Sequence, residues 1–284
     1  MRENSWILGD WLINYEAGIL RRGFSGELIL FLSKLKFIDP IYFTIFLQTS
    51  LFGLFLYFLY DLIKGKDKNI WFFFLIFSPT TLLFTFYDPL AVGRKEVIFY
   101  TFYCIYLIYL IDNFKLSFFA CLVYLFIGVI LTLIHEIFFF FSFFFIFSKY
   151  YYISFREINL KTSLFLKEIF LILGSVIGVI TLIFFSTNDP NVKALVCNRL
   201  LSHGLSNEVC TGAITEIVLS KYIISYKSFG LLDYIISNNY LKTYSIAIIL
   251  FFIPLTVFIF TRKINKRLTI IFFLFLIFQL FFLS

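Results

Sequence analysis

The stretch that decides the fold is FFACLVYLFIGVILTLI at 118–134, followed at once by His135-Glu136 and by IFFFFSFFFIF at 137–147. Neither apolar run contains a charged residue. A strand of a membrane barrel spans only about 10 residues and alternates apolar with polar side chains, whereas a membrane-spanning helix needs about 20 mostly apolar residues. Uninterrupted runs of this kind therefore indicate helices and exclude a barrel.

The rest of the chain has the same apolar character. Of its 284 residues, 61% are hydrophobic, only 14% are charged and 44 are Phe, and the mean hydropathy is +0.94. A soluble domain contains about 25% charged residues. This composition excludes a disordered chain, a collagen and a disulfide-rich secreted scaffold. We expect an all-α, polytopic transmembrane bundle of about eight helices.

The orientation of this bundle follows from the basic residues. The eight apolar segments lie at 41–60, 70–86, 97–111, 118–134, 137–153, 169–186, 243–260 and 268–284. The connections then alternate between two sides, with 12 basic residues in 43 positions on one side and 12 in about 108 on the other. The denser side is cytoplasmic by the positive-inside rule.

This orientation divides the chain into four parts. Residues 1–40 form outward amphipathic juxtamembrane helices, and 41–186 form a transmembrane bundle with outward loops at 87–96 and 135–136. Residues 187–242 form one large outward, periplasmic loop, and 243–284 form two C-terminal transmembrane helices. Met1–Asp10 lacks the apolar stretch of a signal peptide, so we expect no cleaved leader.

The opening segment predicts two short helices on the outer leaflet. Trp6, Trp11 and Tyr15 are typical of a membrane–water interface. Gly23 and Gly26 bracket the expected break between the two helices.

One face of the first helix carries the polar residues. Asp10, Asn14, Gly18 and Arg21 follow at spacings of four, four and three, which places them on one helical face. Arg21 and Arg22 form a basic pair on the outward side, against the topology bias. A guanidinium binds phosphate bidentately, so the pair predicts a lipid-linked phosphate ligand. The alternative is bulk phospholipid binding or pairing with nearby glutamates.

The second outward loop is also rich in charge. Asp88, Arg94, Lys95 and Glu96 lie within ten residues, and Gly93 allows close approach of a ligand. A carboxylate beside cations suits glycosyl transfer, because the carboxylate takes the acceptor proton and the cations stabilise the departing phosphate. The alternative is an ordinary polar hairpin tip.

His135-Glu136 forms the third polar site. Ionisable residues near membrane depth are costly and indicate function, although an interfacial hairpin turn is the alternative. Position 139 is Phe139, so no zinc motif follows. Cys197 and Cys210, both in the outward 187–242 segment, are candidates for a disulfide.

These motifs, taken in order, resemble a known family. They are Asp10-Trp11-Leu12-Ile13-Asn14-Tyr15, Gly18, Arg21-Arg22-Gly23, Gly26-Glu27, Gly93-Arg94-Lys95-Glu96 and His135-Glu136. They resemble the integral-membrane proteins of bacterial capsule and O-antigen gene clusters, the Wzy-type polysaccharide polymerases. The resemblance implies a glycosyltransferase-C-like architecture that joins undecaprenyl-pyrophosphate-linked oligosaccharide repeats at the outer face of the inner membrane.

Roles for individual residues follow from the motifs and this resemblance. Asp10 is the first candidate for the catalytic base and His135 the second, with Asp88 and Glu136 as further catalytic candidates. The expected substrate-binding residues are Asn14, Tyr15, Arg21, Arg22, Arg94, Lys95 and Glu96. We expect no cofactor, no metal and no nucleic acid. The expected partners are a lipid-linked oligosaccharide, membrane lipid and a chain-length regulator.

Three other functions stay open at this point. One is a single-sugar transferase that uses a polyprenyl-phosphate donor, the second is a transporter or flippase for a lipid-linked sugar, and the third is a non-catalytic scaffold. A flippase would place charges along a central path through several helices. Here the ionisable residues concentrate at the outward ends of helices, which favours chemistry at one face.

Overall fold

The computed structural model describes residues 2–36, 38–64, 93–111, 117–155, 162–185, 187 and 191–215, and within these ranges the chain is helical and forms no β-sheet. The α-helices are α1 (Arg2–Leu12), α2 (Gly23–Lys36), α3 (Pro40–Ile63), α6 (Glu96–Ile105), α7 (Phe118–Ile134), α8 (Phe138–Phe155), α9 (Leu166–Phe185) and α10 (Val192–Ser202). A π-helical turn, η2 (Tyr106–Leu110), continues α6, and 3₁₀ turns lie at Thr162–Phe165 (η3) and Asn207–Thr211 (η4).

Five of the predicted apolar segments are confirmed as helices. The segments 41–60, 97–111, 118–134, 137–153 and 169–186 correspond to α3, α6 with η2, α7, α8 and α9. By length and apolar composition, α3 and α9 could each cross a membrane. The other predicted segments, 70–86, 243–260 and 268–284, lie outside the described residues.

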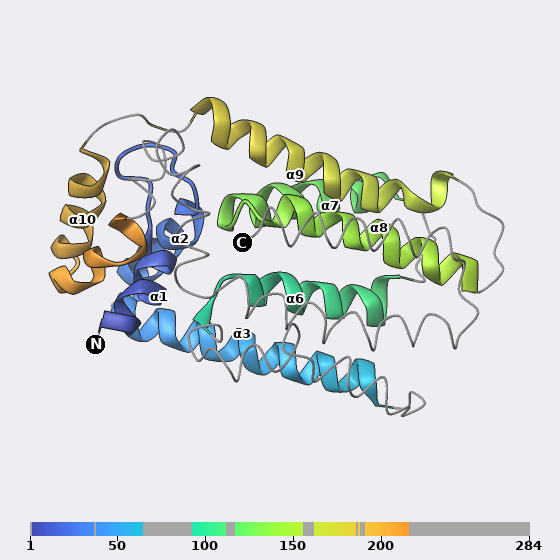
Figure 1. The fold of residues 1–284 in the computed structure, drawn as a ribbon, viewed down its shortest axis with the longest axis horizontal. Helices are drawn as coiled ribbons and strands as arrows, with labels where there is room; N and C mark the ends of the chain where they lie inside the picture. Colours follow the sequence, from blue (N-terminus) through green and yellow to red (C-terminus); the bar gives the residue numbers. More distant parts are fainter. Residues whose placement is uncertain are drawn as a thin grey trace, which may run out of the picture. The chain divides into compact units, whose positions relative to one another are not determined.

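The described residues belong to one unit, built from Met1–Lys64 and Gly93–Val218. In this unit α3, α6, α7, α8 and α9 run side by side, while α1, α2 and α10 gather at one end of them (Figure 1). The consecutive helices α7, α8 and α9 alternate in direction. The turn before α6, the link between α7 and α8 and the end of α9 therefore meet α1 and α2 at the same end, which we call the α1 end.

Close backbone contact joins α7 to α9. The spacing of Gly174 and Gly178 predicts close helix packing, and the structure confirms it. A Cβ on Gly174 would overlap the Leu125 carbonyl, and one on Gly178 would press on Thr132. Gly128 of α7 meets α9 in the same way. These small residues fix the position of the α7 C-terminus, from which the chain continues into His135.

The opening segment contains two short helices, as predicted, but the break between them lies earlier than expected. Helix α1 ends at Leu12 and α2 begins at Gly23. The loop between them passes through left-handed backbone at Gly18 (φ +97°) and at Arg22 (φ +64°). Gly26, expected beside the break, lies in the first turn of α2 and packs directly on the Ile13 carbonyl.

The predicted helical face of Asp10, Asn14, Gly18 and Arg21 is wrong, because α1 ends two residues before Asn14. The Asn14 side chain is fully buried, and its Nδ2 donates to the Val196 carbonyl of α10 at 3.5 Å. Asn14 therefore attaches the loop to α10 and does not lie on a helical face with Asp10.

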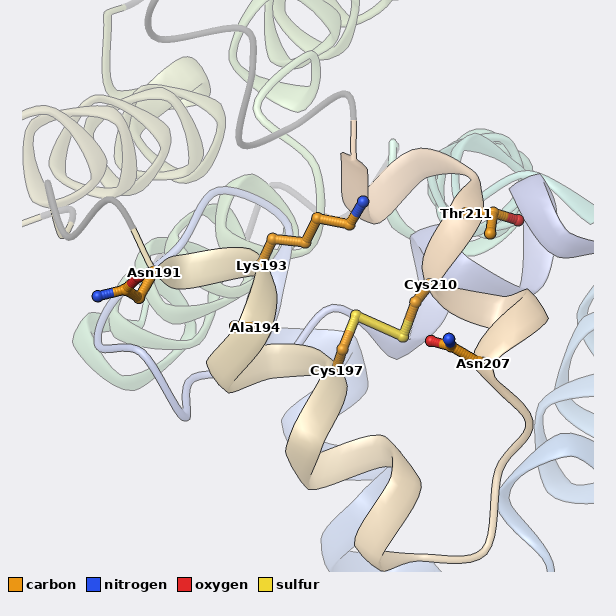
Figure 2. A pocket seen from close by; sticks show the side chains of 7 residues that line it. All are labelled: Asn191, Lys193, Ala194, Cys197, Asn207, Cys210 and Thr211. Carbon is orange, nitrogen blue, oxygen red and sulfur yellow. A yellow bond between two sulfur atoms is a disulfide. The ribbon is translucent and has the colours of Figure 1, made fainter.

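Helix α10 and η4 are fastened to this loop and to each other. Arg199 of α10 donates two hydrogen bonds to the Glu27 carboxylate of α2, each 2.8 Å long. A disulfide joins Cys197 of α10 to Cys210 of η4, with 5.9 Å between their Cα atoms (Figure 2). The described part of the segment 187–242, which the sequence predicts to face outward, is thus a folded cap at the α1 end.

Candidate functional site

Six ionisable side chains from separate parts of the chain meet at the α1 end. We call them the charge cluster, and they are Asp10, Arg22, Lys95, Glu96, His135 and Glu136. Helix α1 supplies the first and the loop before α2 the second. The start of α6 supplies two, and the link between α7 and α8 supplies the last two. Three motifs that are far apart in the sequence therefore form one site.

Arg22 is the centre of the charge cluster. Its Nε and Nη2 donate to the Glu136 carboxylate over 2.9–3.2 Å, and its Nη1 donates to Asp10 Oδ1 at 3.4 Å. Left-handed backbone costs a non-glycine residue about 1–2 kcal/mol, so these contacts compensate for strain at Arg22. Burial acts to lower the pKa of Arg22, but the charges of Glu136 and Asp10 outweigh it and raise that pKa.

Lys95 holds the loop between α1 and α2 by a contact with its backbone. Its side chain is fully buried, and Nζ donates to the Arg22 carbonyl at 2.9 Å and lies 3.8 Å from Asp10 Oδ2. Burial lowers the pKa of Lys95 to about 8, although the charge of Asp10 opposes this shift. Lys95 therefore holds the Arg22 backbone in place and contributes a cation near neutral pH.

Glu136 is held ionised by its basic neighbours. Burial alone would raise the pKa of its carboxyl, but the charge of Arg22 and the hydrogen bonds from its side chain lower this pKa to about 2. Arg21 adds a weaker contact, since its Nε lies 3.3 Å from Glu136 Oε1. Glu136 is therefore an anchor for arginines and not a proton donor at physiological pH.

His135 is neutral in this arrangement. Its ring is buried, and the Ile137 backbone N–H donates to Nδ1 at 3.3 Å, which places the ring proton on Nε2. Nε2 faces Glu96 Oε1 at 3.7 Å. Burial and the charge of Arg22 lower the pKa of His135, against the opposing charges of Glu136, Glu96 and Asp10. Neither ring nitrogen has a free lone pair, so Asp10 fits the role of a base better.

Two residues whose role the sequence did not indicate hold the turn before α6. Trp11 was expected at a membrane interface, but it is 1% exposed and its Nε1 donates to the Gly93 carbonyl at 2.6 Å. Gln48 of α3 donates to the same carbonyl at 3.2 Å. The Trp11 contact keeps Lys95 close to α1. In the sequence, the only indication of this contact is that Trp11 and Gly93 both belong to the motifs quoted above.

The remaining predicted residues lie around the charge cluster or apart from it. Arg94 is exposed beside Lys95, and the Tyr15 backbone N–H donates to Glu27 Oε2 at 3.2 Å, away from Asp10. Asn14 is a structural residue of the loop, as described above. Asp88 lies outside the described residues. In the part of the chain that the structure describes, no group of three or more His, Cys, Asp or Glu side chains could hold a metal ion.

A second buried ionic group lies among η2, α8 and α9. Tyr106 donates to Glu168 Oε1 at 2.8 Å, and Lys149 Nζ lies 3.8 Å from the same oxygen. Both charged side chains are only 1% exposed. No periodic signal in the sequence indicated that Lys149 and Glu168 would be buried together. Their contact joins the two helices that carry them.

A pocket of about 390 Å³ lies beside the disulfide, on α10 and η4 (Figure 2). The residues that line it are Asn191, Lys193, Ala194, Cys197, Asn207, Cys210 and Thr211. None of these residues belongs to the charge cluster, and most of their side chains are exposed.

Comparison of the chain with protein-family models, with curated proteins and with solved structures gives no significant match.

Proposed function

We propose that this chain is a polytopic membrane glycosyltransferase that polymerises undecaprenyl-pyrophosphate-linked oligosaccharide repeats at the outer face of a bacterial inner membrane. The observation that carries the proposal is the meeting of six ionisable side chains at one end of a set of apolar helices. Charges gathered at one end favour chemistry at a membrane face. A transporter would instead need them along a path through the membrane.

Asp10 is the proposed base. Its Oδ1 and Oδ2 face Arg22 at 3.4 Å and Lys95 at 3.8 Å, distances that leave lone pairs for a substrate proton. In the proposed step Asp10 takes the proton of an acceptor hydroxyl, and the oxygen attacks the anomeric carbon of the donor sugar. The bond from that carbon to the pyrophosphate oxygen breaks, and the electron pair leaves with the pyrophosphate. Nearby arginines stabilise the negative charge that develops on this leaving group.

The membrane placement is part of the same proposal. Helices α3 and α9 have the length and composition of spans, and α6, α7 and α8 run beside them as shorter apolar helices. The basic-residue asymmetry favours an outward α1 end. The reaction would then take place where a lipid-linked donor presents its phosphates, at the lipid–water boundary.

The test is the substitution Asp10→Asn, which keeps the shape of the side chain and removes its basicity. A positioned base contributes about 10²–10⁴-fold, so we expect polymerisation to slow by at least about 100-fold. Single repeats should accumulate on the lipid carrier, and surface glycan should lose its long chains. The measurement is glycan length and carrier-bound repeats in a strain that lacks the gene and expresses each variant.

The matched control is Asp61→Asn, the same change at the far end of α3, where the carboxylate pairs with Lys64. This variant should make glycan of normal length. Full-length glycan from Asp10→Asn would contradict the assignment of the base. Loss of activity on addition of EDTA would contradict the polymerase reading and favour a metal-dependent, single-sugar transferase.

A further inference from the structure

The adjacent arginines both reach the Glu136 carboxylate, but their contacts otherwise differ. Arg22 directs three nitrogens to two carboxylates, and its backbone is left-handed and held by Lys95. Its side chain is 22% exposed, whereas that of Arg21 is 40% exposed. A pair that looks uniform in the sequence is therefore asymmetric in space.

Arg21 retains a donor that the described part of the protein does not use. Its Nε is buried and has no hydrogen-bond partner among the residues that the structure describes, although Glu136 Oε1 lies 3.3 Å away. That oxygen already accepts from two nitrogens of Arg22. A buried donor without a partner is costly, and an ion pair without a hydrogen bond relieves only part of this cost.

The unused Nε–H is one arm of the side-on fork by which a guanidinium binds an oxyanion. The other arm, an Nη–H of Arg21, belongs to a side chain that is partly open to solvent. A phosphate oxygen would satisfy the Nε–H and replace the imperfect contact with Glu136. The exposed Arg94, in the turn before α6, adds positive charge at the same α1 end.

We propose that the two arginines have different roles: Arg22 is a positioning residue that shapes the loop, and Arg21 is the residue whose guanidinium binds a phosphate oxyanion of the ligand. The identity of that phosphate as the pyrophosphate of a lipid-linked sugar rests on the proposed function. The binding chemistry does not rest on it, since a phospholipid headgroup offers the same oxygens.

The experiment compares Arg21→Gln, Arg21→Lys and Arg22→Gln in the purified full chain, kept in a non-ionic detergent. Inorganic pyrophosphate and detergent-dispersed phosphatidylglycerol are titrated separately by calorimetry, and unfolding midpoints are measured without ligand. The control Lys34→Gln removes one exposed positive charge from α2. This design distinguishes loss of the Arg21 guanidinium from loss of net charge and from loss of folding.

We expect Arg21→Gln to weaken binding of one or both probes at least tenfold with an unchanged unfolding midpoint. Arg21→Lys should weaken it less, because the charge remains but the fork is lost. Arg22→Gln should lower the unfolding midpoint, and Lys34→Gln should bind within twofold of the wild type. Dependence on Arg21 for pyrophosphate indicates a soluble or carrier phosphate, and dependence for phosphatidylglycerol alone indicates a headgroup.

Binding of both probes by Arg21→Gln within twofold of the wild type would overturn the inference, as would failure of the wild type to bind either probe. A lower unfolding midpoint for Arg21→Gln than for Arg22→Gln would reverse the assigned roles and also overturn it. Anion binding through Arg21 with full-length glycan from Asp10→Asn would refute the proposed base and leave this inference standing.

Discussion

Glu136 should make the stability of the protein depend on pH in a way that one substitution removes. Its pKa lies at about 2 instead of its ordinary 4.5. A depressed pKa contributes stability that is present above the unfolded-state pKa and is lost as the pH falls through the folded-state pKa. A shift of this size corresponds to about 3 kcal/mol in all. From the same two pKa values, about 2 kcal/mol should be lost between pH 7 and pH 3.

The assay is urea unfolding of the full chain in a non-ionic detergent, followed by tryptophan fluorescence, since Trp11 is buried. Glu136→Gln should be less stable than the wild type at pH 7, and this gap should shrink by about 2 kcal/mol at pH 3. The matched control is Glu16→Gln, because the Glu16 side chain is 49% exposed beside Arg199. Exposed pairs contribute little, so the control should follow the wild type.

A gap between wild type and Glu136→Gln that is equal at pH 7 and pH 3, within about 0.5 kcal/mol, would refute this reasoning. It would mean that Arg22 does not hold the Glu136 carboxylate ionised in the folded protein. A gap that widens at pH 3 would refute it more strongly, because it would require a raised pKa.

Two further predictions concern the packing of α2 and the disulfide of the cap. Gly26→Ala should lower the free energy of unfolding by about 1–3 kcal/mol, because its Cβ would overlap the Ile13 carbonyl. Gly53→Ala in α3, where no atom of the described residues lies within 4 Å of the added Cβ, should be neutral or stabilising in the same urea titration, and equal effects of the two variants would contradict the packing. The double variant Cys197→Ala/Cys210→Ala should have a free energy of unfolding about 3 kcal/mol lower, because the disulfide closes a loop between residues 13 positions apart and so restricts the unfolded chain. A reducing agent should lower the stability of the wild type and leave the double variant unchanged; a wild type insensitive to reduction would contradict this prediction.

The positions of the apolar helices could be predicted because charged or turn-forming residues bound each apolar run. The predicted segment 118–134 coincides with α7, and 137–153 differs from α8 by one residue at its start and two at its end. The helix spacing of Asp10 and Asn14 misled, because a 3.6-residue period is also compatible with a helix that stops between them. Hydrogen bonds from the Asn14 side chain decide where the chain leaves α1, and such contacts depend on tertiary neighbours.

The site could be predicted as motifs but not as contacts. The sequence indicated that Arg21-Arg22, Lys95 and Glu136 matter, yet it gave no means of telling which arginine pairs with which carboxylate. Which arginine pairs with which carboxylate depends on the left-handed backbone at Arg22, and no pattern in the sequence predicts that conformation. Burial of Lys149 and Glu168 was missed for a related reason, since each is costly to bury alone and only the pair makes it tolerable.

The large sequence separation between paired charges at the α1 end determines when each pair can form during synthesis. Arg22 and Glu136 are 114 residues apart, and Glu27 and Arg199 are 172 residues apart. At about 5–20 residues per second, a ribosome needs about 6–23 s to supply Glu136 after Arg22, and about 9–34 s to supply Arg199 after Glu27. During that interval Asp10, which precedes Arg22 in the chain, is the one of its two carboxylate partners that has already been made. The bidentate contact of Arg22 with Glu136 therefore forms only after α7 has been made, whereas its contact with Asp10 does not depend on α7.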